Sequence, residues 1–410
     1  ASTSCRDPRA SHTPIVTERT SDMGSVASRR PEGSVSKLFT LLRLGERLKT
    51  KILASMTDLS ELDRGELEQA LADLGAPRFH GTQIWRWLWR KNVTDPAAMT
   101  DLGRELRQRL SGAVTASAPT LVKKDVSADG TAKYLLALAD GRRIESVYIP
   151  ESDRGTLCVS SQAGCAVGCR FCSTGHQGFS RNLSTGEIIA QLWHAEHALR
   201  QRLGTSERII SNVVMMGMGE PLYNFDNVVT ALKIVMDDQG IALSRRRITL
   251  STSGVVPMIP RIGEALDVNL AVSLHAVNDE VRDTLVPINR KWPIAELLKA
   301  CEAYPGAKNS RRITFEYAML KGVNDSGADA RELVRILKPI HAKVNLIPFN
   351  PWPGAPYECS SNNRIHRFAE IVNDGGLSAP VRTPRGRDIA AACGQLKSQS
   401  VRRRGEKVLL

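Results

Sequence analysis

The stretch TLCVSSQAGCAVGCRFC at residues 156–172 places three cysteines in one short segment. Cys165, Cys169 and Cys172 are separated by three and then two residues, and Phe171 directly precedes the last cysteine. Three thiolates this close together suit a loop that wraps a cubic iron–sulfur cluster and leaves its fourth iron without a protein ligand. The alternative is zinc, but structural zinc sites usually have four protein ligands, often in two separated pairs, and the chain has no second C-x-x-C pair. The segment therefore favours an iron–sulfur cluster with one open iron.

The composition favours a polyanionic partner and a reducing compartment. The net charge is +13 and the pI is near 9.5, as is typical of proteins that bind nucleic acid. No apolar run approaches the roughly eighteen residues of a membrane span, so no membrane partner is expected. Eight cysteines, three of them in one loop, fit metal or redox use better than a secreted disulfide framework. We therefore expect a cytoplasmic protein, and its 410 residues predict two or three domains.

The first part of the chain divides into an extension and a small helical domain. Residues 1–56 are rich in Ser, Arg and Thr, lack apolar periodicity outside LFTLLRL at 38–44, and are predicted to be disordered. Residues 57–115 are predicted to form a small helical RNA-binding domain, because Leu67, Leu71 and Leu74 follow at helical spacing and further helical segments come after them.

The segment RFHGTQIWRWLWRK at 78–91 carries the RNA-binding hypothesis for this domain. On a helix Ile84, Trp85, Leu88 and Trp89 share one face and would form core, whereas Trp87 points the opposite way, near Arg90 and Lys91. An aromatic ring between cations can stack an unpaired base. Packing of Trp87 against the next domain is an equally weighted alternative.

The remaining chain predicts an α/β fold. Residues 116–150 alternate like a β meander, with Glu145 on its last strand, and residues 151–396 repeat strands and helices. Strands are expected near 156–160, 209–215, 246–252, 268–274, 311–318, 342–348 and 379–382. Helices are expected at 184–202, 225–237, 256–265, 294–304, 327–338 and 362–373. This alternation predicts a full or partial (βα) barrel, whose reactive residues belong at the carboxyl ends of its strands.

The end of the chain is basic. From Leu377 onward it holds eight Lys or Arg residues against two acidic ones, and residues 397–410 are treated as a basic tail. This stretch is predicted to be a mobile segment that contacts phosphates, although a solvated charge run is the more common meaning of such a pattern.

Several segments together resemble the RlmN family of radical S-adenosylmethionine (SAM) enzymes. The cysteine loop resembles that of the radical SAM superfamily, and the resemblance to RlmN covers roughly residues 57–396. The segments that carry it are MMGMGEPL at 215–222, ITLSTSG at 248–254, SLHA at 273–276, IPFNP at 347–351 and DIAAACGQL at 388–396. The resemblance implies a radical SAM partial barrel that methylates C2 of an adenine in 23S rRNA, at the peptidyl-transferase centre, and in the anticodon loop of tRNAs.

The resemblance also implies the cofactors and their ligands. They are one [4Fe-4S] cluster on Cys165, Cys169 and Cys172, and SAM, of which two molecules are used per turnover. From the residues alone, Gly219 allows a close backbone approach and Glu220 offers a carboxylate to an ammonium group. The positions that match the family's SAM-binding residues are Gly219, Glu220, Ser251, Ser273, Leu274, His275 and Asn350. His275 by itself would have been interpreted as a structural histidine.

The mechanism implied by the resemblance uses two further cysteines. Adenine C2 is not nucleophilic, so ordinary methyl transfer is excluded and a radical route is needed. In the family, a cysteine matching Cys393 first takes a methyl group from one SAM molecule, and the radical made from a second SAM converts that methyl into a methylene radical that adds to C2. Cys158 then attacks Cys393, and the product leaves as the two cysteines form a disulfide. Glu145 matches the proton acceptor, although Cys158 could itself remove the proton.

The implied partners are 23S rRNA, tRNA, an external electron donor and a disulfide reductant, and the protein is expected to be a monomer. The alternatives are the sibling methyltransferase acting at C8 of the same ribosomal adenine, and a non-catalytic RNA-binding protein with a structural metal centre. A methylthiotransferase is disfavoured because no second cysteine trio precedes the cluster loop. Cys5, Cys301 and Cys359 match no functional position.

Overall fold

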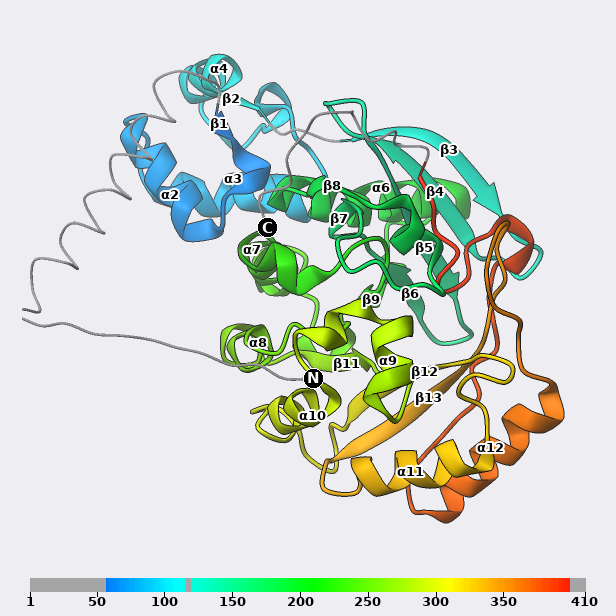
Figure 1. Ribbon diagram of the computed structural model, residues 1–410. Helices are drawn as coiled ribbons and strands as arrows, with labels where there is room; N and C mark the ends of the chain where they lie inside the picture. Colours follow the sequence, from blue (N-terminus) through cyan, green and yellow to red (C-terminus); the bar gives the residue numbers. More distant parts are fainter. Residues whose placement is uncertain (1–56, 116–118, 399–410) are drawn as a thin grey trace, which may run out of the picture. The chain divides into compact units, whose positions relative to one another are not determined.

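The computed structural model describes residues 57–115 and 119–398, and within them the largest element is a nine-stranded sheet (Figure 1). Its strand order is β13-β12-β11-β10-β9-β6-β5-β4-β3. The strands are β3 (Thr120–Val126), β4 (Ala132–Ala137), β5 (Arg143–Pro150), β6 (Gly155–Cys158), β9 (Asn212–Met215), β10 (Ile248–Thr252), β11 (Asn269–Ser273), β12 (Ile313–Met319) and β13 (Ala342–Pro348).

The sheet is parallel from β6 to β13 and antiparallel from β3 to β6. Among the described strands β13 and β3 stand at opposite ends of the order and do not pair, so the barrel is partial, as predicted. The predicted meander is confirmed as β3–β5, and it extends the same sheet through the pairing of β5 with β6.

Helices connect the parallel strands and cover the outer face of the sheet (Figure 1). They are α6 (Thr185–Leu203), α7 (Phe225–Met236), α8 (Met258–Leu266), α9 (Asp279–Leu285), α10 (Ile294–Glu302), α11 (Gly327–Leu337) and α12 (Asn362–Asp374). Local sequence sets their starts: Ser184 and Glu187 form a capping box at α6, and Ser326 with Asp329 form another at α11. Gly204, with φ +62°, ends α6 in the left-handed conformation.

Strand alternation separates the core from the inner face. On β12, Phe315 and Tyr317 are fully buried, whereas Glu316 and Ala318 line an internal cavity. Successive side chains on a strand point to opposite faces, so the apolar set packs under the helices while the polar set faces inward. This places chemistry-bearing residues inside the sheet's curve.

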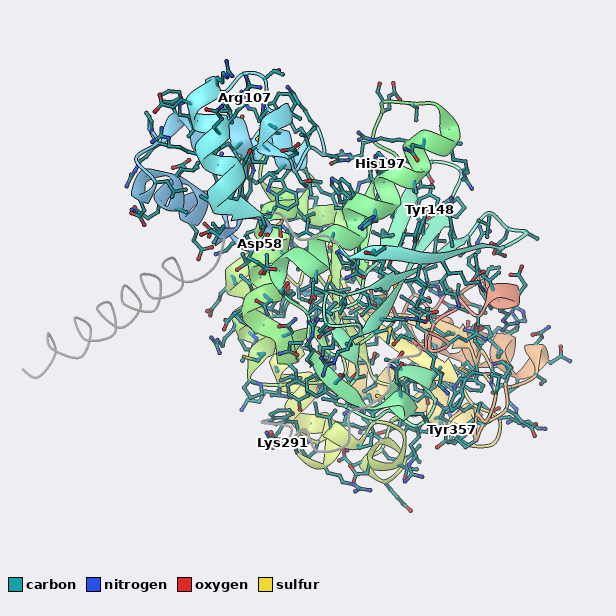
Figure 2. The ribbon with its side chains drawn as sticks, turned by 90° about the horizontal axis from the view of Figure 1, so that it is seen from above. Asp58, Arg107, Tyr148, His197, Lys291 and Tyr357 are labelled. Atoms are coloured by element: carbon teal, nitrogen blue, oxygen red, sulfur yellow. The ribbon has the colours of Figure 1, made fainter. Side chains whose placement is uncertain are left out.

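The helical segment at residues 57–115 has the predicted core. It contains α2 (Arg64–Asp73), α3 (Phe79–Trp89) and α4 (Arg104–Ala113), with β1 (Thr57–Asp58) paired to β2 (Val114–Thr115). Ile84, Trp85, Leu88 and Trp89 are all buried, as expected from their spacing. The Trp85 Nε1–H donates to Asp237 at the end of α7, 3.1 Å away, which ties this segment to the following one. In Figure 2, Arg107 of this segment and Tyr357 of the later elements lie on opposite sides.

Some elements differ from the prediction. The stretch 379–382 runs beside β13, where Arg382 N–H donates to Leu346 O, but it forms only an isolated bridge at Val381. Pro380 lacks the N–H that a ladder needs, so no strand forms.

Short elements were not predicted: β7 (Gln162–Gly164), β8 (Phe179–Asn182), α5 (Ser173–Gln177), α9, and the 3-10 turns Leu59–Glu61, Pro96–Ala98, Pro221–Asn224, Arg245–Arg247, Pro287–Arg290 and Arg387–Ile389.

Three predictions concern residues outside the described ranges: the disordered extension 1–56, Cys5 within it, and most of the basic tail 397–410. Within the described ranges no helix combines the length and apolar character that crossing a bilayer requires.

Candidate active site

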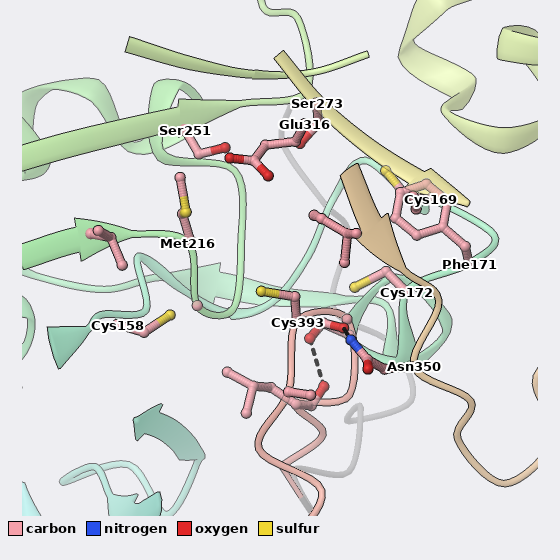
Figure 3. Close-up of a pocket in the computed structure, with 18 of the residues that line it drawn as sticks. Cys158, Cys169, Phe171, Cys172, Met216, Ser251, Ser273, Glu316, Asn350 and Cys393 are labelled. Atoms are coloured by element: carbon pink, nitrogen blue, oxygen red, sulfur yellow. Dashed lines mark hydrogen bonds between the residues drawn. The ribbon is translucent and has the colours of Figure 1, made fainter. Parts of the chain in front are cut away.

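A single cavity lies at the carboxyl ends of the parallel strands and brings together five cysteines from distant parts of the chain. Cys158 ends β6, Cys165, Cys169 and Cys172 come from the loop after it, and Cys393 comes from the C-terminal segment. Figure 3 shows Cys158 and Cys393 entering this space from different segments, with Met216 nearby. The other predicted residues that line the cavity are Gly219, Glu220, Ser251, Ser273, His275 and Asn350. The structure thus places these residues in one cavity at the carboxyl ends of the strands, where they were expected.

The cysteine loop is shaped so that its backbone surrounds the thiols. The N–H groups of Val167 and Gly168 point at Cys165, and those of Thr174 and Gly175 point at Cys172. A side chain at Gly175 would put its Cβ 2.6 Å from the carbonyl oxygen of Cys169, so the turn closes only with glycine. N–H groups aimed at sulfur stabilise thiolates and the sulfur atoms of a cluster.

Burial acts in the opposite direction on these thiols. It raises the pKa of Cys165 to about 12, and it raises the pKa of Cys169 well above its usual value. The protein by itself therefore favours neutral thiols, and a bound cationic centre is what would deprotonate them. The thiols of the cysteine loop are therefore soft sulfur ligands that lie close together, and their ionisation depends on a positively charged centre.

The arrangement of the thiols fits a cluster better than a single ion. Within residues 57–115 and 119–398, no three His, Cys, Asp or Glu side chains are grouped closely enough to hold one metal ion. A cubic cluster makes a different demand, because each thiolate binds a different iron and the thiols surround the cluster. Cys165, Cys169 and Cys172 all line one cavity and come from one loop, so their residue type and spacing fit a [4Fe-4S] group.

The turn after β9 supplies a close backbone approach and a buried carboxyl. Gly219 has φ +100°, and a Cβ there would lie 2.5 Å from Cβ of Gln162, so only glycine fits. Glu220 accepts hydrogen bonds from Leu222 N–H (3.1 Å) and Ser253 N–H (2.7 Å), and burial raises its pKa to about 7. Glu220 thus links the ends of β9 and β10 and still faces the cavity, where an ammonium group would hold it ionised.

His275 is held as a neutral ring at the end of β11. Its Nδ1 accepts the Ala318 N–H at 3.0 Å, and burial lowers its pKa to about 3. The ring edge lies against Phe171 of the cysteine loop, with centroids 4.4 Å apart. Its φ of +58° is unusual for a residue other than glycine, and it turns the backbone so that the imidazole faces the cavity.

Leu274 does not line the cavity. Its side chain is fully buried in the core, because it points to the opposite face of the strand end from Ser273. Its role in this structure is carried by the backbone: the carbonyl oxygen accepts from Arg282 and the N–H donates to Glu316 O.

Arg282 is a buried residue that the sequence analysis missed. It lies on α9 with no exposed surface and donates to the carbonyl oxygens of Leu274, Ser273 and Ser253 at 3.0, 3.0 and 2.8 Å. One cation thereby fixes the carboxyl ends of β10 and β11. Burial lowers its pKa to about 10, and it remains charged at neutral pH. Its only sequence signal was an arginine on the inward face of a short helix.

The C-terminal segment is anchored rather than mobile over its described part. Ser173 N–H donates to Gly394 O (2.7 Å), and Thr174 Oγ1 donates to Leu396 O (2.6 Å). Asn350, which lies beside Cys393 in Figure 3, donates to Cys393 O at 3.2 Å. Asn350 also accepts from Arg387 at 2.8 Å. The expected mobility is therefore wrong for residues 377–398, because hydrogen bonds to the cysteine loop fix Cys393 over the cavity.

Glu145 is not in the cavity. It is 6 % exposed, and its carboxylate accepts the Lys397 N–H at 2.8 Å and lies 3.2 Å from Lys133 Nζ. Val147 and Ile149, on the same face of β5, do line the cavity. Glu145 is the next residue along that face, lies just outside the cavity and is covered by the C-terminal segment. Burial raises the pKa of Glu145.

Three charged residues of the cavity wall, Glu316, Arg382 and Arg385, were not predicted as site residues. Glu316 on β12 is buried, accepts from Asn345 at 2.7 Å and points toward Ser251 (Figure 3). Arg382 lies close enough to Cys393 and Cys158 to interact with their charges. Burial nevertheless raises the pKa of Cys158 to about 12. A carboxylate in the apolar run ITFEYAM was the available signal for Glu316; Arg382 had none beyond the basic stretch.

Comparisons with known proteins agree with this geometry. The model of the "Radical SAM superfamily" matches residues 159–334, and the "Ribosomal RNA large subunit methyltransferase N-terminal domain" matches residues 57–115. A crystal structure of a radical SAM methyltransferase from Sphaerobacter thermophilus superimposes with a TM-score of 0.78 at 46% identity, covering 83% of this chain and 99% of that one.

Curated relatives are similar over most of the chain. The "Dual-specificity RNA methyltransferase RlmN" of Acidiphilium cryptum is 56% identical, covering 83% of this chain and 89% of the relative. The protein of the same name from Rhodospirillum rubrum is 52% identical, covering 93% of this chain and 89% of the relative.

Proposed function

Because the chain belongs to the RlmN family of radical SAM RNA methyltransferases, we propose that it methylates C2 of an adenine in 23S rRNA and in the anticodon loop of tRNAs. The observation that carries this proposal is the meeting of Cys158 and Cys393 in the cavity that also holds the three loop cysteines. A fixed thiol pair beside a cluster site is what methylation through a protein-bound methyl group requires.

The cofactors follow from the family and from the fit of the residues. Cys165, Cys169 and Cys172 would hold one [4Fe-4S] cluster, and the turn at Gly219 and Glu220 would receive the amino group of SAM. Ser251, Ser273, His275 and Asn350 would offer neutral hydrogen-bonding groups to the rest of SAM. When bound, the cluster and SAM supply a one-electron cleavage that yields a 5′-deoxyadenosyl radical; two SAM molecules would be used in each turnover.

The chain's own residues would carry the methyl group. Cys393 Sγ loses its proton and takes a methyl group as a thioether, and its loop is fixed by Asn350 and by Ser173. Transfer of a hydrogen atom from that methyl to the SAM-derived radical would leave a carbon radical on the methyl of Cys393, and this radical adds to C2 of the adenine. The adduct then gives up the C2 proton and one electron, which the cluster would take back. Cys158 Sγ, as a thiolate, bonds to Cys393 Sγ as the carbon–sulfur bond breaks, the electron pair of that bond stays with the new methyl carbon, which takes up a proton, and an external thiol must reduce the disulfide.

The proton on C2 needs an acceptor that reaches the cavity. Cys158 reaches it as the structure stands, whereas Glu145 is separated from it by Lys397. Glu145 could accept the proton only after the segment at 394–398 moves away. Cys158 and Cys393 are both free thiols in the structure. The disulfide between them would be transient because an external thiol reduces it in each turnover.

The test is to incubate anaerobically reconstituted protein with SAM, a reductant and either RNA, and to locate the methyl group by mass spectrometry of digested RNA. We expect 2-methyladenine in both RNAs and about four irons per chain. 8-Methyladenine would assign the sibling activity instead. Stoichiometric zinc without iron in freshly isolated anaerobic protein would contradict the radical mechanism.

The two cysteines have separable expected phenotypes. Cys393→Ala should carry no methyl group from SAM and form no product, while its cluster still assembles because no cluster ligand is changed. Cys158→Ala should still load the methyl and add it to RNA, and should then accumulate a covalent protein–RNA adduct, visible as a mass increase that RNase reduces to a nucleotide remnant. Wild-type turnover by Cys158→Ala would leave Cys158 with a packing role only.

A further inference from the structure

A second charged surface lies at the end of the sheet opposite to the cavity. The loops that lead into β10, β12 and β13 carry exposed cations just before or at the strand starts. We call this surface the basic face, and it consists of Arg245, Arg246, Arg247, Lys308, Arg312 and Lys343. Since parallel strands all begin at one edge, residues distant in sequence are gathered there.

The basic face has an uncompensated positive charge. Asp267, on the neighbouring loop that leads into β11, is already bound by Arg245 at 3.1 Å and by Arg311. Asp237 and Asp238, at the start of the loop that leads into β10, lie within 4 Å of Arg64. Among residues 57–115 and 119–398, Arg246, Lys308 and Arg312 take part in no ion pair. No ion pair within 4 Å therefore accounts for these three cations, although Arg312 Nε donates to Asn309 O at 3.4 Å and Lys308 lies near enough to Asp267 to act on its charge.

The face is also hollowed. A pocket separate from the catalytic cavity is lined by Arg245, Arg246, Lys308 and Arg311, together with Asn269, Ser310 and the carboxylate of Asp267, so its four cations outnumber its one anion. Guanidinium and ammonium groups around a polar depression suit a phosphate oxygen, which accepts several charge-assisted hydrogen bonds at once. A flat solvated charge run would not form such a depression.

We propose that the basic face binds the phosphate backbone of large ribosomal RNA at a position remote from the target adenine; this inference rests on the proposed function. The seven residues of β12 separate the two ends of the sheet by about 20 Å, at about 3.3 Å per residue. A large folded RNA can reach both ends. A short stem-loop seated in the cavity extends outward from it and cannot also reach the opposite end. The face thereby distinguishes the two RNA classes.

The test compares how one variant binds two different RNAs. Arg246→Gln, Lys308→Gln and Arg312→Gln are combined, and binding is measured over a range of salt for a large 23S rRNA fragment that contains the peptidyl-transferase centre and for an isolated anticodon stem-loop. The logarithm of the affinity falls linearly with the logarithm of the salt concentration, and each lost phosphate contact makes this slope shallower by about 0.7 to 0.9. We therefore expect the slope for the rRNA fragment to become shallower by about 2 to 3, and the affinity to be reduced about tenfold or more. Stem-loop binding and methylation should remain unchanged.

The control variant also removes three positive charges, but at another place. It combines Arg335→Gln, Arg364→Gln and Arg367→Gln, at residues that are all exposed on α11 and α12. It should bind both RNAs like the wild type. The single variant Lys308→Gln, with a slope change of about 0.7 to 0.9, checks that the effect does not come from misfolding.

The inference is overturned if the triple variant binds the rRNA fragment with the wild-type slope, or if it weakens both RNAs equally. It is also overturned if wild-type protein binds phosphatidylserine vesicles through these residues while rRNA binding is unaffected, because the face would then serve an anionic membrane. If the wild type methylates neither RNA, the proposed function fails instead.

Discussion

At the scale of single residues, His275 illustrates how burial and backbone geometry fix a protonation state. Its Nδ1 accepts a backbone N–H, so the ring proton resides on Nε2, and its left-handed φ costs about 1–2 kcal/mol that the surrounding contacts must offset. The pKa of the ring is lowered to about 3, first by burial and then by the charge of Arg282. The histidine therefore enters the site as a neutral donor at physiological pH.

This pKa predicts a pH dependence of stability. Below pH 6.5 the unfolded chain protonates His275, whereas the folded protein does not until about pH 3, so the unfolded state binds more protons and stability falls as the pH falls through this window. His275→Asn keeps an acceptor and tolerates positive φ, and should remove this dependence. Between pH 6 and 4, the free energy of unfolding of the wild type should fall relative to the variant by up to about 1.4 kcal/mol per pH unit.

The measurement is urea unfolding of the cluster-free proteins at several pH values. Glu220 contributes with the opposite sign, because its raised pKa adds stability that is lost as the pH rises from about 4.5 through about 7. That contribution is common to both proteins and cancels in the comparison. His366→Asn, at an exposed position, is the control and should follow the wild type. Parallel curves for His275→Asn and wild type would contradict the prediction.

At the scale of elements, α9 acts as a short helix that fixes two strand ends. Arg282 reaches from it to the carbonyl oxygens of Ser253, Ser273 and Leu274, and also donates to Asn289 at 2.7 Å. These carbonyls are close to the predicted SAM contacts Ser251, Ser273 and His275. The helix is therefore part of the support of the site.

Replacing Arg282 should damage both stability and SAM binding. Arg282→Met leaves several buried carbonyl oxygens without donors, at about 1–3 kcal/mol each, so we expect a loss of at least about 3 kcal/mol in the free energy of unfolding, together with weaker SAM binding. Arg282→Lys keeps the charge but not the fork of donors, and should rescue little. Urea unfolding and equilibrium dialysis with SAM are the measurements. Full rescue by lysine would show that charge alone matters; exposed Arg290→Gln is the control.

At the scale of the whole molecule, the helical segment 57–115 is joined to the catalytic unit by specific contacts. Trp85 and Arg64 both reach Asp237 at the end of α7, and Arg90 reaches the backbone of the same loop. Trp87 is half-buried, donates to Asp101, and has Lys91 Nζ 3.4 Å from its ring centroid. The ring is thus held in place with a cation beside it.

We expect Trp87→Ala to weaken RNA binding by about 1–3 kcal/mol, the usual scale for the loss of one stacked base, and to leave SAM cleavage without RNA intact. Trp87→Phe retains an aromatic face and should retain most of the affinity. Anisotropy titrations with RNA and thermal unfolding separate the two roles of this residue. If Trp87→Ala loses thermal stability in proportion to its affinity, the tryptophan serves packing and the stacking hypothesis fails.

The amino-acid sequence predicts the alternating α/β fold and the cysteine loop, and all the predicted site residues except Glu145 and Leu274 line the cavity. These features depend on short segments of sequence. Apolar periodicity predicts the strands and helices, Ser184 and Ser326 cap the starts of helices, and three cysteines within eight residues indicate a cluster loop. Because parallel strands present their carboxyl ends together, residues such as Ser251 and Ser273 could be assigned to one site without knowing their neighbours.

Which of these residues reach the cavity, and what surrounds them, depends on contacts between segments that are distant in sequence. Glu145 is covered by Lys397, Leu274 turns into the core, and Arg282 connects strand ends, all through partners distant in sequence. The meeting of Cys158 with Cys393 likewise depends on hydrogen bonds between the C-terminal segment and the cysteine loop. Local periodicity specifies the face on which a side chain lies, but a buried polar group is satisfied by whichever donor or acceptor the completed fold brings to it.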